Sequence, residues 1–315
     1  MPETRYTWNL LRAGPIKLDG GGMFGVIPRV VWSKTIVPDE LNRITLAHNC
    51  NLLKSPDGSR ILIETGTGDK LDAKMRSIFG LTDRTIVEAV SEVARLEDIK
   101  HVIVSHLHFD HAGGVTRRAH DSERPDWTDP ASGLSVVRTF GDAEIVVQRR
   151  EWQDALANNS VMTKTYYRDH LEPIRQQIRT IDSPLPYPAG NTPARDELPE
   201  NSVRDRMTEV LPGMFVFRVP GHTWGQQAIL FIDDRGRTIV FTPDVMPTIH
   251  HAGAAYSLAY DVEPYTSMIT RRWLLDEAAS NDWLLVLDHE PGNPLVRVRP
   301  DGRRWYKLIP EDAQS

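Results

Sequence analysis

The chain has 315 residues, 40% of them hydrophobic, and its 37 basic and 43 acidic residues leave a formal net charge of −6. This length suffices for one large domain or two modest ones, and the composition excludes the disordered and fibrous classes. A negative net charge without a concentrated basic patch argues against a nucleic-acid partner. The single cysteine, Cys50, cannot form an internal disulfide, and we interpret it as a small buried hydrophobic residue.

The amino terminus carries no visible secretory signal. Met1–Trp8 has no basic region followed by an apolar stretch. No apolar run approaches the roughly 18 residues of a membrane-spanning helix. These features predict a cytoplasmic protein with no membrane partner.

The segment at residues 19–33 combines glycines and a proline with apolar side chains, and we interpret it as a loop. Gly20–Gly22 lack the GK[ST] residues and the helix that would follow them in a phosphate-binding loop. The apolar side chains are either core or an exposed lip over a substrate, and the lip is favoured. The candidate substrate-binding residues are Met23, Phe24, Ile27 and Trp32.

The first third of the chain reads as a β-hairpin, a helix and a buried strand. The hairpin covers Arg43–Leu53 and Arg60–Glu64, joined by a Pro-Asp-Gly turn. Apolar residues at helical spacing run from the expected N-cap Asp83 to Leu96, and the strand His101–Ser105 follows. A helix that leads into a buried strand is typical of an α/β protein.

The middle of the chain, at about residues 115–205, predicts a helical and loop excursion. Thr116–Gly133 is polar, Glu144–Val147 reads as a strand, and Arg149–Arg179 reads as helical. Asp182–Asn201 is rich in proline and charge, which predicts a loop.

Strands resume in the last third. Met214–Val219, Gln227–Ile232 and Thr238–Phe241 are expected strands, and a helix at Thr266–Ala279 precedes the strand Trp283–Leu287. Strand pairs followed by a helix and a strand occur in both halves. This pattern predicts one α/β domain over residues 1–315, folded as a four-layer αββα sandwich.

The segment that carries chemistry directly follows the strand ending near Ser105. It reads His106-Leu107-His108-Phe109-Asp110-His111, and Gly113 and Gly114 follow after one alanine. Alternate residues of an extended backbone share a face, so His106 and His108 can bind one cation together. Asp110 and His111 are placed for a second cation where the chain turns.

Imidazole and carboxylate are suitable ligands for zinc, iron, manganese or cobalt, but this segment alone leaves each ion short of partners. Three later residues can supply them, because each comes just after an apolar strand. They are His222, Asp244 and His289. Loops at strand ends are where a rigid scaffold collects site residues from distant parts of the chain.

The HxHxDH residues, followed in order by Pro220-Gly221-His222, Asp244 and His289, resemble the signature of the metallo-β-lactamase-fold hydrolases. Ser105–Gly114 and Asp19–Trp32 are similar to the N-acyl-homoserine lactonase (quorum-quenching) branch and its methyl-parathion-hydrolase relatives. The resemblance implies a dinuclear metal hydrolase that opens a lactone, with N-acyl-homoserine lactone as the favoured substrate. It also implies the αββα fold.

The resemblance further implies a ligand set and a mechanism. One metal ion would be held by His106, His108 and His222, and the other by Asp110, His111 and His289, with Asp244 bridging both. The expected cofactors are two divalent ions, zinc first, with manganese, iron and cobalt as alternatives. A hydroxide bridging the two ions would attack the carbonyl carbon, and Asp110 could also carry the proton.

The sequence departs from the family pattern at two places. Many lactonases of this branch have a tyrosine three positions after the bridging aspartate, where this chain has Pro247. The candidates for the vacant role are His250, His251, Tyr256 and Tyr260. Glu64 stands where an aspartate is usual, which should shift one supporting hydrogen bond without changing the ligand set.

Other interpretations stay open at this stage. The same centre could attack a phosphotriester or an aryl ester, and a domain that binds metal without catalysis is a further alternative. The partner is expected to be a small molecule, with a homodimer as an open possibility. Most histidines outside the constellation are expected to be surface or hydrogen-bonded core residues, namely His48, His101, His120 and His170.

Overall fold

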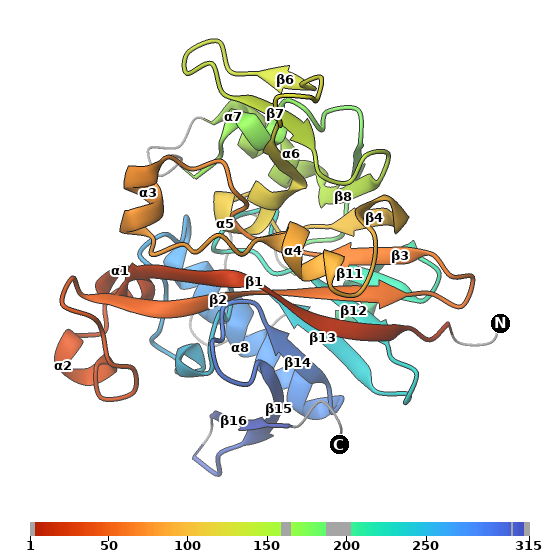
Figure 1. The fold of residues 1–315 in the computed structure, drawn as a ribbon. Helices are drawn as coiled ribbons and strands as arrows, with labels where there is room; N and C mark the ends of the chain where they lie inside the picture. The colour runs from red at the N-terminus through yellow and green to blue at the C-terminus, as the bar shows by residue number, and fades with distance from the viewer. Residues whose placement is uncertain (1–3, 159–164, 187–202, 304, 312–315) are drawn as a thin grey trace. The chain divides into compact units, whose positions relative to one another are not determined.

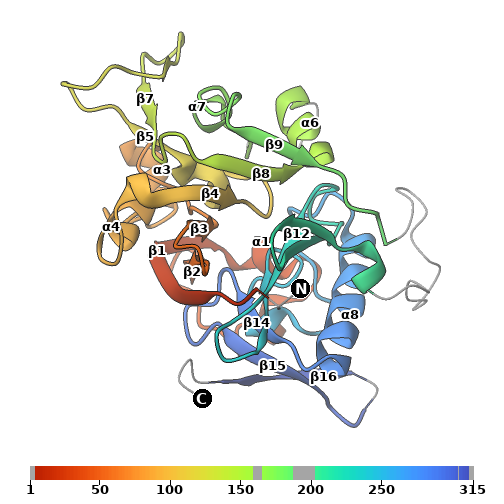
Figure 2. The same cartoon turned by 90° about the vertical axis from the view of Figure 1, so that its right-hand side faces the viewer.

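A computed structural model of the protein describes residues 4–158, 165–186, 203–303 and 305–311. The strands form sheets of six, seven and three strands. Figures 1 and 2 show the strands and helices from two sides. Contacts within the chain divide it into two compact units. Unit 1 is drawn from Met1–Arg5, Lys17–Leu46 and Asp182–Ser315, and unit 2 from Tyr6–Ile16 and Ala47–Ile181.

The six-stranded sheet supplies most of the framework of unit 2. Its order is β1-β2-β3-β4-β8-β9, with β2 and β3 antiparallel and β3, β4, β8 and β9 parallel. The strands are β1 Thr7–Asp19, β2 Arg43–Lys54, β3 Arg60–Ile63, β4 Ile99–Ile103, β8 Glu144–Gln148 and β9 Ile178–Ile181. The predicted hairpin and the predicted strands at β4 and β8 are confirmed.

Helices and a small sheet complete unit 2. The helices are α3 Ala73–Ile78, α4 Ile86–Ser91, η1 Leu96–Asp98, α5 Phe109–Ala112, η2 Gly113–Val115, α6 Arg149–Ala157 and α7 Arg168–Leu171. The three-stranded sheet has the order β5-β7-β6, with β5 Thr116–Arg118, β6 Trp127–Thr128 and β7 Ser135–Arg138. Helix α6 lies beside β8 and β9 (Figure 2). Cys50 is a buried member of the core of this unit, as predicted.

Two helix predictions in unit 2 need correction. Helix α4 begins after Thr85 rather than Asp83, because Thr85 and Glu88 form a capping box that satisfies the first backbone N–H groups. Among the described residues, the helical prediction for Arg149–Arg179 holds only at α6 and α7, and its end belongs to β9, which pairs with β8. Residues 159–164 of that range, and 187–201 of the predicted loop at Asp182–Asn201, lie outside the described residues.

The seven-stranded sheet is the framework of unit 1. Its strands follow chain order and are antiparallel except for the parallel pair β13 and β14. They are β10 Thr208–Leu211, β11 Met214–Arg218, β12 Gln227–Ile232, β13 Thr238–Thr242, β14 Leu284–Leu287, β15 Leu295–Pro300 and β16 Tyr306–Pro310. The predicted strands at β11, β12, β13 and β14 are confirmed.

Helix α8 (Pro264–Ser280) links β13 to β14 and packs on this sheet (Figure 1). Its Trp273, Leu274 and Leu275 join Val240 and Leu285 of the strands in the core of unit 1. The predicted helix at Thr266–Ala279 is therefore confirmed. Two 3-10 turns, η3 Val203–Arg206 and η4 Ile249–His251, complete the unit.

The predicted loop at residues 19–33 contains two short helices, α1 Gly20–Phe24 and α2 Arg29–Trp32. The side chain of Asp19 accepts the backbone N–H of Gly22 at 2.9 Å, and Pro28 stands at the N-cap of α2. These start signals outweigh the low helix propensity of three glycines. Among the described residues, no helix combines the length and the apolar character needed to cross a membrane.

Candidate metal centre

The HxHxDH segment leaves the carboxyl end of β4 in unit 2, where a parallel sheet exposes its loops. His106, His108, Asp110 and His111 are all buried, at 0%, 7%, 8% and 1% exposure. One ring nitrogen of His106 lies within 4.8 Å of one of His108. On α5, Asp110 Oδ1 lies 3.8 Å from His111 Nε2. The structure thus brings together the pairs expected from alternation and from the turn.

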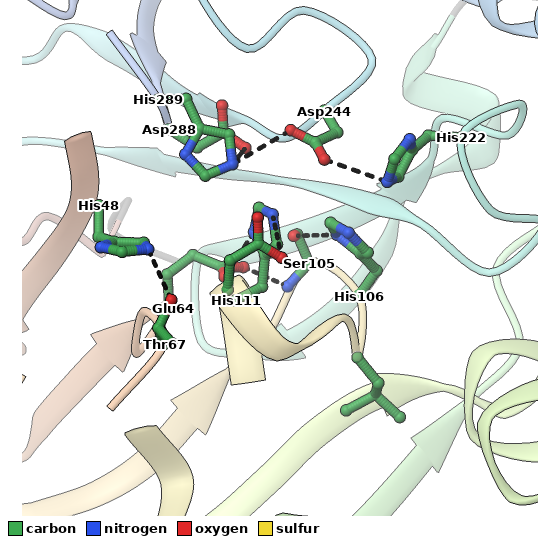
Figure 3. Close-up of polar contacts among 12 residues, drawn as sticks. His48, Glu64, Thr67, Ser105, His106, His111, His222, Asp244, Asp288 and His289 are labelled. Carbon is green, nitrogen blue, oxygen red and sulfur yellow. Dashed lines mark hydrogen bonds and ion pairs between the residues drawn. The ribbon is translucent and has the colours of Figure 1, made fainter. Parts of the chain in front are cut away.

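Side-chain oxygens hold the Nδ1 atoms of two of these rings (Figure 3). Glu64 Oε2 lies 3.1 Å from His111 Nδ1, and Ser105 Oγ lies 3.0 Å from His106 Nδ1. The other oxygen of Glu64 accepts the backbone N–H of Ser105. A histidine that ligates a metal commonly donates its second ring N–H to such an oxygen. Glu64 therefore still supports a predicted ligand in place of the usual aspartate.

The two glycines after the motif are required by close packing. A Cβ atom on Gly113 would lie 2.2 Å from the carbonyl oxygen of Thr67, and one on Gly114 would lie 2.2 Å from that of Thr65. The hydroxyl of Thr65 also donates to the carbonyl of His111 at 2.7 Å. The chain after β3 thereby fixes the position of α5.

The second set of donors lies in unit 1, after the parallel strands β13 and β14. Thr242 and Leu287 are register partners, so Asp244 and His289, each two residues further on, leave the same sheet edge. Asp244 Oδ2 lies 3.1 Å from His222 Nε2, and Asp244 Oδ1 lies 3.3 Å from His289 Nε2. Figure 3 shows Asp244 between the two rings. One carboxylate thus presents a different oxygen to each imidazole.

Two aspartates of unit 1 were not among the predicted site residues. Asp261 Oδ1 lies 2.9 Å from His222 Nδ1, and its Oδ2 accepts the backbone N–H of Leu258 at 3.0 Å. Asp288 offers a carboxylate oxygen within 4.8 Å of donor atoms of Asp244 and His289. The neighbour position beside His289 could have suggested Asp288. Asp261 belongs to no motif, and only the fold reveals it.

The candidates for the role left vacant at Pro247 fall into two groups. His250, Tyr256 and Tyr260 are partly buried. Burial lowers the pKa of His250, although Glu290 opposes the shift, so its imidazole is neutral at pH 7. His251 is 1% exposed, and its ring nitrogens lie 2.8 Å from Thr248 Oγ1 and from the carbonyl oxygen of Met23. His251 is therefore a packing residue, and its candidacy for substrate contact is wrong.

The exposed apolar lip is also wrong for three of its four predicted residues. Met23, Phe24 and Trp32 are 1%, 0% and 1% exposed. The Phe24 ring is stacked between Trp32, at 5.2 Å, and His251, at 4.7 Å. Helices α1 and α2 turn these side chains to the inside of unit 1, whereas Ile27 is partly buried. The exposed large hydrophobic side chains of the segment are Val26, Val30 and Val31.

The histidines expected outside the centre either contact other groups of the protein or are exposed to solvent. His48 is buried between the carbonyl oxygen of Gly14, at 3.1 Å, and Thr67 Oγ1, at 2.9 Å. His101 lies 3.5 Å from Glu144, and His120 is exposed. His170 is buried with Nε2 at 3.2 Å from the carbonyl oxygen of Leu107. The prediction of surface and hydrogen-bonded core residues is confirmed.

The donors of both units fit divalent transition ions. Each unit offers buried imidazole nitrogens together with carboxylate oxygens, the ligands such ions take in proteins. His106, His111 and His222 each have an oxygen at Nδ1, which orients the Nε2 side of the ring.

Comparison with known proteins supports this interpretation. The model of the Metallo-beta-lactamase superfamily matches residues 43–117, which include the HxHxDH segment. An N-acyl homoserine lactonase from a Bacillus species is 25% identical over 232 residues, which cover 69% of this chain and 70% of that protein. A lactonase of the same name from Bacillus cereus is 24% identical over 228 residues, again 69% of this chain and 70% of that protein.

Solved structures show the same fold. A probable metal-dependent hydrolase from Staphylococcus aureus has a TM-score of 0.76 at 24% identity, covering 99% of this chain and 100% of that one. AidC, a dizinc quorum-quenching lactonase, has a TM-score of 0.69 at 17% identity, covering 99% of this chain and 96% of that one. The predicted α/β class and metallo-β-lactamase fold are confirmed.

Proposed function

We propose that this chain, a metal-dependent hydrolase of the metallo-β-lactamase superfamily, opens the ring of N-acyl-homoserine lactones with two divalent ions, zinc in first place. The observation that carries the proposal is the carboxylate of Asp244. Its two oxygens face different imidazoles, at 3.1 Å from His222 and 3.3 Å from His289. A carboxylate in this position suits two ions better than one.

The proposed ligand set follows the family resemblance. His106, His108 and His222 would hold one ion, Asp110, His111 and His289 would hold the other, and Asp244 would offer one oxygen to each. When bound, two such ions would supply a nucleophilic hydroxide at neutral pH and would polarise the carbonyl oxygen of the substrate. Asp288 lies close enough to Asp244 and His289 to act as an additional donor or to orient His289.

The remaining steps fall to side chains of the protein itself. Asp110 is the proposed carrier of the proton that the leaving alkoxide needs, because its carboxylate is buried beside His111. His250, Tyr256 and Tyr260 are the proposed donors to the substrate carbonyl. The neutral imidazole of His250 and the two phenols can each donate one hydrogen bond at pH 7.

The substrate class rests on the relatives named as lactonases and on the resemblance at Asp19–Trp32. The same nucleophile could attack a phosphotriester or an aryl ester. Relative rates must therefore decide which class is the substrate. We expect kcat/KM for a series of N-acyl-homoserine lactones of short, medium and long acyl chain to exceed that for paraoxon and for aryl acetates. Faster turnover of the phosphotriester or aryl ester would overturn the lactonase assignment.

A metal control belongs to the same experiment. Chelation should abolish turnover of every substrate in the panel, and zinc should restore it. Turnover of lactones that survives complete removal of metal, checked by elemental analysis, would contradict the proposed centre.

A further inference from the structure

The backbone between two of the proposed ligands is held by two buried side chains. We propose that Glu151 and His170 are positioning residues that preset the chain between His106 and His108 for metal binding. The inference rests on the proposed function, because it takes these two histidines as ligands. It adds two residues that belong to neither the ligand set nor the substrate contacts.

The residues around Leu107 need such support because they lie beyond the sheet. Strand β4 ends at Ile103, and the N–H of Val104 makes a last bond to the carbonyl of Val146 at 3.3 Å. The side chain of Leu107 is buried in the core of unit 2. Buried backbone groups outside a sheet must find other hydrogen-bond partners.

Glu151 provides the first partner. It lies on α6, is 0% exposed, and accepts the backbone N–H of Leu107 on Oε1 at 2.9 Å. The same oxygen accepts the hydroxyl of Tyr166 at 3.0 Å. Burial, together with the charge of Glu151, raises the pKa of Tyr166, so the phenol keeps its proton and remains a donor. A buried carboxylate needs such donors, and one of them is the peptide that joins His106 to Leu107.

His170 provides the second partner. It lies on α7, is 0% exposed, and has Nε2 3.2 Å from the carbonyl oxygen of Leu107. Burial lowers the pKa of His170, although the carboxylate of Asp169 opposes this shift. A neutral imidazole protonated on Nε2 donates to this carbonyl. The peptide that joins Leu107 to His108 is therefore held as well.

The topology explains how two sequence-distant residues reach one short segment. Strand β8 is the parallel neighbour of β4, so the chains that leave their carboxyl ends run side by side. Helix α6 starts directly after β8, which places Glu151 beside the segment that leaves β4. The ring of Tyr166 also lies 5.0 Å from that of His108. Glu151 and Tyr166 thus contact both the backbone and one ligand ring.

Matched variants separate this positioning role from the effect of side-chain volume alone. Glu151→Met keeps most of the volume and removes the acceptor, whereas Glu151→Gln keeps an oxygen for both donors. His170→Leu and His170→Gln form the second pair. We expect zinc affinity, measured by competition with a chromogenic chelator, to fall about 10–100-fold in Glu151→Met and His170→Leu, the range for lost support of a ligand. The two glutamine variants should stay within about threefold of the wild type.

Kinetics give a second readout on the same variants. With zinc in excess, kcat should fall in Glu151→Met and His170→Leu while KM changes little, since no substrate contact is removed. Equal zinc affinity in each pair, in folded protein, would overturn the proposal. Lost zinc affinity in a protein that turns over no lactone would leave the positioning role intact and overturn only the proposed substrate.

Hydrogen exchange of the wild-type protein tests the same point where a variant fails to fold. A preset backbone predicts that the Leu107 amide exchanges slowly in the metal-free protein, because Glu151 already holds it. Exchange at the rate of an unstructured peptide that slows only when zinc is added would show that the metal, and not Glu151, orders this segment, and would overturn the proposal.

Discussion

Asp244 is the residue on which the dinuclear proposal depends most. Asp244→Asn keeps the shape of the side chain but removes the charge and one of the two acceptor oxygens. Because both flanking imidazoles face this carboxylate, we expect the metal content to fall below two ions per chain. We expect kcat/KM to fall by at least about a thousandfold, equivalent to about 4 kcal/mol. Elemental analysis and lactone hydrolysis check both outcomes.

The matched control is Asp233→Asn in the same unit. Asp233 is 0% exposed and bonds the side chain of Arg237 at 2.8 Å in the turn between β12 and β13. Losing this buried bond should cost about 1–3 kcal/mol of unfolding free energy without removing metal. Metal loss in both variants would mean that unfolding, and not ligation, explains the effect at Asp244.

His251 predicts a pH dependence of stability in the metal-free protein. Burial, more than the neighbouring Arg271 and His250, lowers its pKa from 6.5 to about 3. The unfolded chain then binds a proton that the folded one does not, so stability falls as the pH falls from 6.5 towards 3. Between pH 7 and pH 5, protonation of this residue alone should lower the free energy of unfolding by about 2 kcal/mol.

Urea unfolding at both pH values, compared between the wild type and His251→Phe, isolates this contribution. The phenylalanine can keep the stack on Phe24 but cannot take up a proton. We expect the loss of stability between the two pH values to be smaller in the variant by the stated amount. Parallel losses in the two proteins would show that His251 titrates normally.

Helices α1 and α2 bury their large side chains against each other and against His251. Phe24 lies between Trp32 and His251, so Phe24→Ala should leave a cavity and cost about 3–5 kcal/mol of unfolding free energy. Val26 is 74% exposed, and Val26→Ala should change stability by less than about 0.5 kcal/mol. Urea unfolding of both variants measures the difference. An unchanged stability in Phe24→Ala, with an altered preference for acyl length, would restore the substrate lip.

Elements with strong local signals could be predicted from the sequence, and those fixed by tertiary contacts could not. The hairpin β2–β3 and helix α8 are each marked by long apolar runs or periodicity. Helix α1 has no such signal in the sequence. Its three glycines predict a loop, and its N-terminus depends on a hydrogen bond to the side chain of Asp19. Every residue of strand β9 is partly buried. Its sequence does not alternate between apolar and polar residues as that of a typical half-buried strand does.

For the whole molecule, the candidate ligands could be predicted because each follows a strand with a clear apolar pattern. Of their supporting residues, Glu64 could be named from the family resemblance, but Asp261 and Glu151 could not. Asp261 contacts His222 from 39 positions away, and Glu151 contacts Leu107 from 44. Such pairs share no spacing that a single sequence could reveal. The chemistry of the centre is thus encoded locally, whereas the shell that orients it depends on the completed fold.

Metal removal gives the prediction for the chain as a whole. The candidate donors lie between His106 and His289, and the proposed ligand set divides them between two ions. We therefore expect the reconstituted protein to hold two ions per chain by elemental analysis. A ligand that binds only the folded state at a hundred times its Kd stabilises that state by about 2.7 kcal/mol per site, so chelation should lower Tm and zinc should restore it. The control is His120→Ala, because His120 is exposed and should leave both the metal content and the shift in Tm unchanged. A stoichiometry of one or zero after reconstitution with zinc, manganese or cobalt would contradict the dinuclear centre.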